Sequence, residues 1–461
     1  MKNLNYKYIG LLISALTIIV GCKKEFLDKK PATNINVPTT LSDLQLLLDN
    51  THDLNHSPSL GDLSSDDYKL GDQEWLNLED ISGKNAYIWE KDIFAGSGDI
   101  VDWNRSYQQV LAANVVLEQL LKIKRDNSNY ITYDNIKAMA LFMRSYMFFD
   151  LAQVFTLPYD ESSADKDLGI PLRLVGDINL VSKRATLQET YNQILSDALM
   201  SSRLVSMNYV KGDFNRPTKA SVYGLLSRVY LNMRKYPLAG LYADSAISLH
   251  PTLIDYNLID KTKSVTIPLM KNDEILYNSY LNLGEAIFYL FRSSNFSIDP
   301  RLYSLYDQND LRKDVFFTKN GNTINLKPGY TGTNITGNSI ATDELYLTRA
   351  ECYARNGDDQ KALDDLNTLL IKRFVNGTYS LIQNLRGTTL LNTILTERRK
   401  ELVMRGLRWN DLRRLNKDGF NITLSREVNG TIYTLPPNDA RYALPFPPDV
   451  IARTGMPQNN R

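Results

Sequence analysis

The chain has few of the residues that metal centres and disulfide-stapled folds depend on. Among 461 residues there are only two cysteines, Cys22 and Cys352, and three histidines. Two cysteines exclude a disulfide framework, and Cys352 lies in a helical pattern where a buried structural thiol is expected. His52 and His56 could share a helix face, but no further ligand follows at a useful spacing. We therefore predict no metal site.

Sequence motifs of catalysis are missing as well. There is no G-x-S-x-G, no H-E-x-x-H, no Walker phosphate loop and no dinucleotide-binding fingerprint. Carboxylates are plentiful, but Asp66 and Asp67, like Asp364 and Asp365, are adjacent rather than placed to face each other across a glycosidase cleft. We interpret these acids as solvated surface. The sequence predicts no catalytic residue and no cofactor.

Neither a strong net charge nor a long internal apolar run is present. The 53 basic and 52 acidic residues leave a formal charge of +1, which gives no reason to expect a nucleic-acid partner. No long apolar segment follows the first 21 residues, so the remainder is not predicted to span a membrane.

The N-terminus has the pattern of a bacterial lipoprotein signal. A short start containing lysines precedes an apolar run from Ile9 to Val20, which is too short to cross a bilayer, and the motif I-V-G-C ends at Cys22. We predict that residues 1–21 are removed and that Cys22 carries a lipid, which holds a protein to a membrane without crossing it. The alternatives are a plain secretory signal or an N-terminal membrane anchor.

Helical patterns dominate the rest of the chain. Helices are predicted at about 103–122, 135–155 and 186–204, and another begins after Pro217. Two later segments share a tetratricopeptide register, in which small residues let paired helices approach and large residues fill the space between pairs. The aligned positions are Tyr223 with Tyr346, Ser227 with Ala350, Tyr230 with Tyr353, and Ala239 with Ala362. Two generic helical hairpins are the alternative.

The predicted fold class is mostly α. A tetratricopeptide-like scaffold of helix pairs is expected at about 103–250 and 342–415, with irregular, loop-rich regions at about 50–100 and 252–341 that hold a few short strands. Insertions in repeat proteins tend to gather on one face, often the binding face. The ligand site is therefore expected in the two irregular regions.

Three further stretches carry a family resemblance. They are C-K-K-E-F-L-D from Cys22, Y-L-T-R-A-E from Tyr346, and E-R-R-K-E-L from Glu397 followed by R-G-L-R-W-N-D-L-R-R from Arg405. L-P-F-P from Leu444 completes the pattern. The chain resembles the SusD/RagB family of outer-membrane nutrient-binding lipoproteins, as one SusD-like domain over residues 22–461.

The resemblance implies a non-catalytic binding protein with a loop-built ligand site. It implies a SusC-like TonB-dependent transporter as partner, over which the protein sits as a lid, and an outer-membrane location, lipid-anchored and facing the cell exterior. The usual ligands are oligosaccharides, and the RagB branch takes peptides. A structural lipoprotein that binds only partner proteins, and a surface hydrolase, are the competing functions.

Aromatic residues outside the helical register are the candidate ligand contacts. A flat aromatic ring meets the apolar face of a sugar, while acids and amides meet its hydroxyls. The candidates are Trp75, Trp89, Tyr280, Tyr68, Asp67, Tyr277 and Phe296. Both tryptophans could instead pin loops to the scaffold, and Tyr277 alternates with Ile275 as a buried strand residue would. We interpret the basic block 397–414 as architecture, with a Glu401–Arg405 pair at i,i+4.

Overall fold

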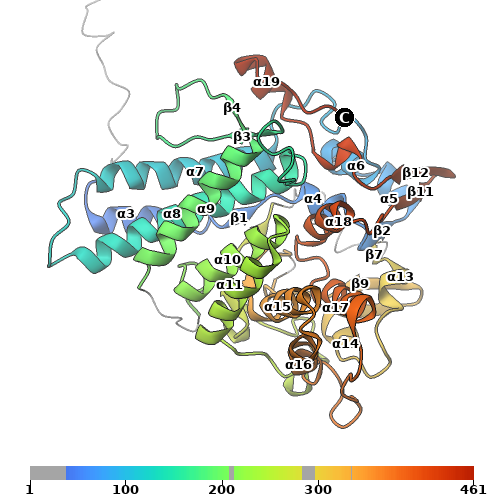
Figure 1. Cartoon of the computed structure of the whole chain (residues 1–461). Coiled ribbons are helices and arrows are strands. Elements are labelled where there is room, and N and C mark those ends of the chain that lie inside the picture. Colours follow the sequence, from blue (N-terminus) through green and yellow to red (C-terminus); the bar gives the residue numbers. More distant parts are fainter. Residues whose placement is uncertain (1–37, 207–211, 283–295, 334) are drawn as a thin grey trace, which may run out of the picture. The chain divides into compact units, whose positions relative to one another are not determined.

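The computed structural model describes residues 38–206, 212–282, 296–333 and 335–461 (Figure 1). Residues from Thr40 to Arg461 form one compact unit. The predicted signal and Cys22 lie outside the described residues. Within the described part, no helix is both long enough and apolar enough to cross a membrane.

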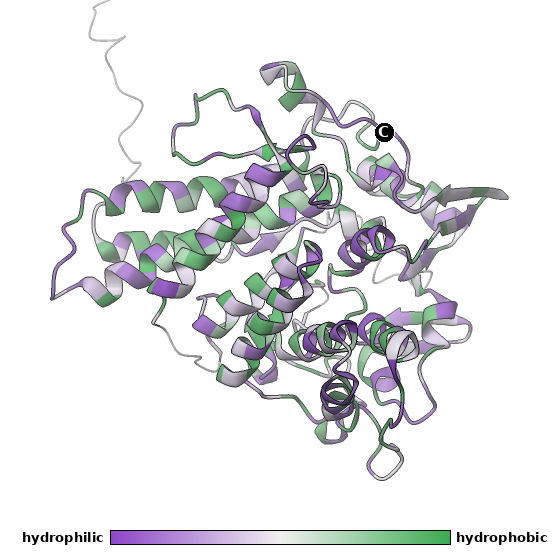
Figure 2. Ribbon diagram, viewed as in Figure 1, coloured by the Kyte–Doolittle hydropathy of each residue, from purple (hydrophilic) through white to green (hydrophobic). Residues whose placement is uncertain are grey.

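The mostly helical fold class is confirmed. The helices are α3 (Leu41–Leu48), α4 (Leu60–Leu63), α5 (Asp72–Leu76), α6 (Ile81–Tyr87), α7 (Val101–Leu120), α8 (Tyr130–Phe155), α9 (Leu187–Leu204), α10 (Lys219–Asn232), α11 (Tyr236–Leu249), α13 (Pro300–Tyr303), α14 (Arg312–Phe316), α15 (Thr342–Asn356), α16 (Asp359–Leu370), α17 (Gly387–Glu401), α18 (Arg408–Lys417) and α19 (Pro448–Thr454). Successive long helices pack as antiparallel pairs, and nearly the whole length of α8 is buried among them (Figures 1 and 2).

The two predicted repeat segments form the pairs α10–α11 and α15–α16. Their close approach depends on small side chains, as the register predicts: Ala239 is fully buried, and the Ser227 hydroxyl donates to its carbonyl at 2.9 Å. A β-carbon on Gly240 would lie 3.0 Å from the β-carbon of Cys352, so α11 and α15 also touch closely. Gly357, at φ 82°, takes the left-handed conformation that ends α15.

The described strands pair two by two. They are β1 (His56–Ser57) with β6 (Tyr280–Leu281), β2 (Tyr68–Leu70) with β7 (Phe296–Ile298), β3 (Leu168–Pro171) with β4 (Arg184–Thr186), β5 (Ile275–Tyr277) with β10 (Ile340–Ala341), β8 (Phe317–Asn320) with β9 (Thr323–Leu326), and β11 (Leu424–Val428) with β12 (Thr431–Leu435). The β1–β6 and β2–β7 pairs join the first irregular region to the second. Short strands therefore bring together the two regions in which the sequence places the ligand site.

The basic block is architecture, as predicted, but its pairing differs from the prediction. Arg405 does not pair with Glu401; its guanidinium bonds the Asp343 carboxylate at 2.5 Å. Glu401 instead accepts from Arg312 at 3.0 Å and from Arg373 at 2.7 Å, with all three side chains buried. Buried charges need partners, and tertiary packing supplies better ones here than the helix's own next turn.

The interpretation of the adjacent acids as solvated surface is wrong for three of the four. Asp67 is fully buried and accepts from Arg399 Nε at 3.1 Å. Asp66 pairs with Arg408 at 2.7 Å, and Asp365 is buried against Arg349. Of the four, only Asp364 is exposed. Arginines from other elements pair with these acids and so link the elements to one another.

Candidate functional site

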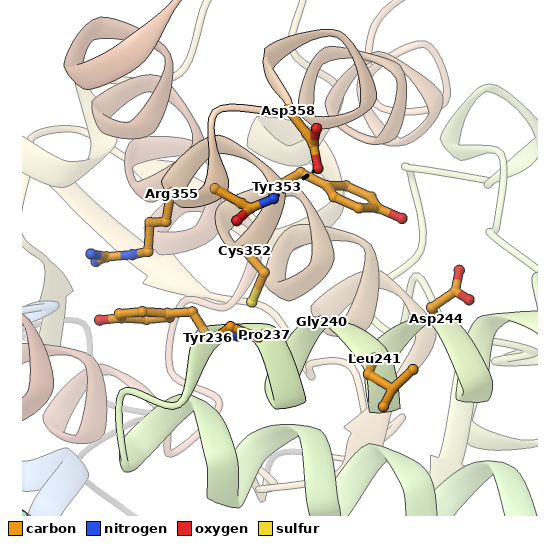
Figure 3. Close-up of a pocket in the computed structure, with 10 residues that line it drawn as sticks. Tyr236, Pro237, Gly240, Leu241, Asp244, Cys352, Tyr353, Arg355 and Asp358 are labelled. Carbon is orange, nitrogen blue, oxygen red and sulfur yellow. Dashed lines mark hydrogen bonds between the residues drawn. The ribbon is translucent and has the colours of Figure 1, made fainter.

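A groove runs between the two repeat pairs, with a volume of about 460 Å³. Figure 3 shows side chains of α11 below and α15 above converging on it. We call it the repeat groove, lined by Tyr236, Pro237, Gly240, Leu241, Asp244, Cys352, Tyr353, Arg355, Asn356 and Asp358.

The repeat groove holds no group prepared for catalysis. The Cys352 side chain is almost wholly buried, and burial raises the pKa of its thiol to about 12, so the thiol stays neutral at physiological pH. Arg355 lies 4.0 Å over the ring of Tyr236 and pairs with Glu351 at 2.8 Å. The groove is an apolar trough with charged residues at its rim.

A second pocket, of about 350 Å³, lies where four segments of the chain meet: 66–69, 87–89, 299–301 and 425–427. We call it the loop pocket. It is lined by Asp66, Tyr68, Lys69, Tyr87, Trp89, Asp299, Pro300, Arg301, Ser425, Arg426 and Glu427. The β2–β7 pairing sets Tyr68 opposite Ile298, which places the start of α13 beside the first irregular region. The β11–β12 hairpin supplies the third wall.

An arginine among aromatic rings forms the floor of the loop pocket. The Arg426 guanidinium lies 3.8 Å from the ring centre of Tyr87, 4.9 Å from that of Trp89 and 5.1 Å from that of Tyr68. It donates to the backbone carbonyls of Tyr87 and Ser65. One buried cation thereby joins three segments, with cation–π contacts in place of a carboxylate partner.

The rim of the loop pocket is charged and open to solvent. Arg301 pairs with Asp299 at 2.6 Å while 74% of its own side chain stays exposed. Burial would raise the pKa of Asp299, but hydrogen bonds from Arg301 outweigh it and lower the pKa below its ordinary value, so the carboxylate stays ionised. Lys69 and Glu427 are also exposed. The rim thus offers donors and acceptors that a hydroxyl-rich ligand could use.

Two of the sequence-predicted residues line this pocket. Tyr68 and Trp89 do so at 3% and 2% exposure, which leaves only a small part of each residue open. Asp67 lies immediately behind the lining. Phe296 is fully buried beneath Tyr68, with the two rings stacked 5.4 Å apart.

The other three predicted residues lie apart from the lining. Tyr277 is buried in the helical core, where its hydroxyl donates to Asn55 Oδ1 at 2.8 Å. Tyr280 is half-buried beside His56, their ring centres 6.2 Å apart. Trp75 is half-buried, and its indole N–H donates to the Lys84 carbonyl at 3.0 Å. Phe296 offers a ligand no open surface, and Tyr277, at 3% exposure, lies in neither pocket lining.

Sequence reasoning missed Lys69, Tyr87, Arg301, Arg426 and Glu427. The strand Leu424–Val428 alternates buried and exposed positions, so its pattern signals a strand with Arg426 on the buried side. No local pattern indicates that this strand packs against residues more than 330 positions earlier.

A buried carboxyl beside this site gives a pH prediction. Asp62 on α4 is wholly buried; burial, and then the neighbouring Asp67 charge, raise its pKa to about 8. The unfolded value is about 3.9, so between these pH values the folded state holds a proton that the unfolded state lacks. Stability should therefore fall as pH rises from about 5 to about 8.

Urea unfolding at the two pH values checks this expectation. Asp62→Asn should flatten the pH dependence, because the amide does not titrate. Asp165→Asn, at an exposed carboxylate, is the matched control and should leave the slope unchanged. An unaltered slope in Asp62→Asn would contradict the assignment.

Two family models match parts of this sequence. A family model described as "Starch-binding associating with outer membrane" matches residues 25–231, and one described as "SusD family" matches residues 330–446. No curated protein matches the sequence.

Solved structures share the fold at low identity. A putative sugar-binding protein from Bacteroides vulgatus is 24% identical over 91% of this chain and 98% of its own, with a TM-score of 0.72. A SusD superfamily protein from Bacteroides thetaiotaomicron is 22% identical over 92% of this chain and 100% of its own, with a TM-score of 0.73. Surface glycan-binding protein A from Bacteroides fluxus is 17% identical over 92% of this chain and 99% of its own, with a TM-score of 0.69.

Proposed function

We propose a function from one premise: this chain belongs to the SusD/RagB family. Membership makes it a binding protein rather than an enzyme. It binds oligosaccharide nutrient at the outer membrane and delivers it to a SusC-like TonB-dependent transporter. A lipid on Cys22 holds it at the cell surface.

The loop pocket is the observation that carries the glycan assignment. It unites both predicted irregular regions with the β11–β12 hairpin, and it sets an aromatic wall against a rim of exposed charged side chains. Sugars are recognised by this combination of ring edges and polar groups. Two solved structures of the same fold are named as sugar- or glycan-binding proteins, which supports the same ligand class.

We propose different roles for the candidate residues. We assign ring-edge contacts to Tyr68 and Trp89, and assign Asp67 and Phe296 to holding that wall in place. Tyr277 belongs to the core beneath. Trp75 and Tyr280 remain proposed contacts for a ligand that extends beyond the pocket, because both keep part of their side chains open.

Rim substitutions should separate binding from folding. Lys69→Ala combined with Arg301→Ala should weaken glycan binding at least about tenfold, since a hydrogen bond to a charged group contributes about 1.5–3 kcal/mol. Lys69 is exposed and its loss should leave thermal unfolding unchanged, whereas loss of Arg301 also removes the partner of buried Asp299 and should lower the melting temperature, so binding is measured well below it. Calorimetry against a panel of starch fragments and other oligosaccharides measures the affinity.

The matched control removes the same charges elsewhere. Lys124→Ala with Arg453→Ala, two exposed positions outside both concavities, should bind as the wild type does. Equal affinity in the rim and control variants would move the ligand site away from the loop pocket.

Two alternatives share the fold. A RagB-like protein would bind peptides, and a peptide arm in the same calorimetric panel tests this. A structural lipoprotein would bind only proteins, a function that the apolar repeat groove favours. Co-purification from outer membranes separates these: a large barrel with ligand binding supports uptake, whereas partners without barrel or ligand support the structural function.

A further inference from the structure

The connection between β3 and β4, residues 172–183, turns apolar side chains outward. We call it the β3–β4 loop; in Figure 1 it projects beyond α7 and α9. Ile178 is 73% exposed, Val181 66% and Leu180 51%. Leu174 and Val175 add to the same surface. Soluble proteins rarely gather this many open aliphatic residues in one short segment unless the surface meets an apolar partner.

Specific hydrogen bonds hold the β3–β4 loop in shape. The Arg173 guanidinium donates to the Leu180 carbonyl at 2.9 Å and to the Asp177 carbonyl at 2.5 Å, closing the loop on itself. The Asn114 amide of α7 donates to the Arg173 carbonyl at 2.9 Å. The Glu118 carboxylate accepts from the Gly176 N–H at 2.7 Å. These hydrogen bonds hold the exposed apolar side chains of the loop in a fixed arrangement.

The same helix that holds the loop also holds the beginning of the fold. Leu44 and Leu48 of α3 pack with Ala113 and Val116 of α7, while Asn114 and Glu118 face the loop. Only 18 positions separate Cys22 from Thr40, where α3 is capped. A fully extended chain of that length spans at most about 60 Å.

We infer that the β3–β4 loop rests on the lipid surface to which Cys22 is anchored. The inference depends on the outer-membrane attachment proposed above. The loop's charges present no barrier, because Arg173 and Lys183 against Asp177, together with Glu118 of α7 beside Gly176, sum to zero. Apolar contacts of this kind add to an acyl chain's hold and fix the protein's tilt on the membrane. The loop thus orients the protein as well as attaching it.

Vesicle binding by a chain without lipid tests the loop itself. The mature chain carrying Cys22→Ser should co-sediment with vesicles of phosphatidylethanolamine and phosphatidylglycerol that contain lipopolysaccharide, the lipid of the outer leaflet. Adding Ile178→Ser, Leu180→Ser and Val181→Ser should reduce the bound fraction at least about tenfold, because burial of apolar area is the driving force. The matched control, Leu258→Ser with Leu121→Ser and Ile432→Ser, changes three aliphatics of 85%, 81% and 67% exposure that lie before β5, at the end of α7 and on β12, and it should bind as the parent does.

Several results would overturn the inference. The first is that the parent does not bind vesicles, and the second is that the loop variant binds them as well as the parent does. The third is that the loop variant keeps vesicle binding but loses a co-purifying transporter. The last would make the loop a protein-docking surface. Calorimetry with glycan is run on the same variants, and should be unaffected; the anchor is tested separately by mass spectrometry of the native N-terminal peptide. Failure of the loop inference is therefore distinguishable from failure of the proposed function.

Discussion

Arg373→Leu is expected to lower the free energy of unfolding by about 3–5 kcal/mol, the loss typical when one partner of a buried ion pair is removed. Arg373 is fully buried, and it donates to Glu401 and to Glu274, each at 2.7 Å. Its third bond, at 2.6 Å, goes to the Ile254 carbonyl. Without this cation, the carboxylates of Glu274, Glu401 and Asp343, whose oxygens lie within 4.8 Å of one another, lose the charge that best balances them.

The loss should depend on pH in a known direction. Burial raises the pKa of Glu274 to about 7 even though Arg373 lowers it, so removing the cation raises that pKa further. A carboxyl with a raised folded pKa takes up a proton on acidification, which relieves the repulsion. Arg373→Leu should therefore lose less stability at about pH 5 than at about pH 8.

Urea unfolding with a matched surface pair checks this expectation. Arg125, half exposed, pairs with Asp134 at 2.8 Å, and Arg125→Leu should cost less than about 1 kcal/mol. If Arg373→Leu does not accumulate as folded protein, Arg373→Lys keeps the charge and should fall between wild type and leucine. Equal losses of unfolding free energy in the buried and surface variants would show that the buried charge cluster stabilises the fold no more than a surface ion pair does.

Carboxylates spaced like these three are sometimes metal ligands, but here their oxygens already have partners. Arg373 holds Glu274 and Glu401, Arg405 holds Asp343, and the Tyr330 hydroxyl donates to Glu274 at 2.5 Å. The cluster is a joint between α15, α17 and the segment before β5. Its members are far apart in sequence, which explains why the local reading of the basic block found the right role and the wrong partners.

The repeat scaffold was predictable because its information is local. Small and large residues recur at fixed spacing within each helix pair, and the positions of Ser227, Ala239 and Ala350 follow directly. A pocket where the two irregular regions meet was predictable in part, since loop-rich insertions gather on one face. Which residues line it was not, because short strands such as β2 and β7 pair segments more than 200 positions apart.

The burial of Trp89 shows where the reasoning about free aromatics was incomplete. An aromatic residue outside the helical register was expected to be available to ligand. In the structure Trp89 packs in a small core with Trp409 and Leu412 of α18, Leu424 of β11 and Tyr442. Loops this long need apolar packing to stay ordered, and Trp89 provides it.

Trp89→Ala should therefore destabilise the protein by about 3–5 kcal/mol, as other large buried aromatics do. The indole is 2% exposed, its N–H donates to the Ser64 carbonyl at 2.9 Å, and it forms one wall around Arg426. Alanine would leave a cavity and an unpaired carbonyl. It would also retain the positive backbone φ of 56°, which costs energy in any L-residue.

Trp75→Ala is the matched comparison for this tryptophan. Trp75→Ala removes one hydrogen bond to the Lys84 carbonyl and one cation–π contact at 4.8 Å, which together should lower the free energy of unfolding by about 1–2 kcal/mol. The sequence alone predicts weaker glycan binding with unchanged melting for both variants. The structure predicts instead that Trp89→Ala melts several degrees earlier and also binds weakly when assayed well below its melting point, because Arg426 and Tyr87 lose their neighbour. Normal melting together with lost binding in Trp89→Ala would restore its assignment as a direct platform, and normal binding in both variants would remove the tryptophans from the ligand site.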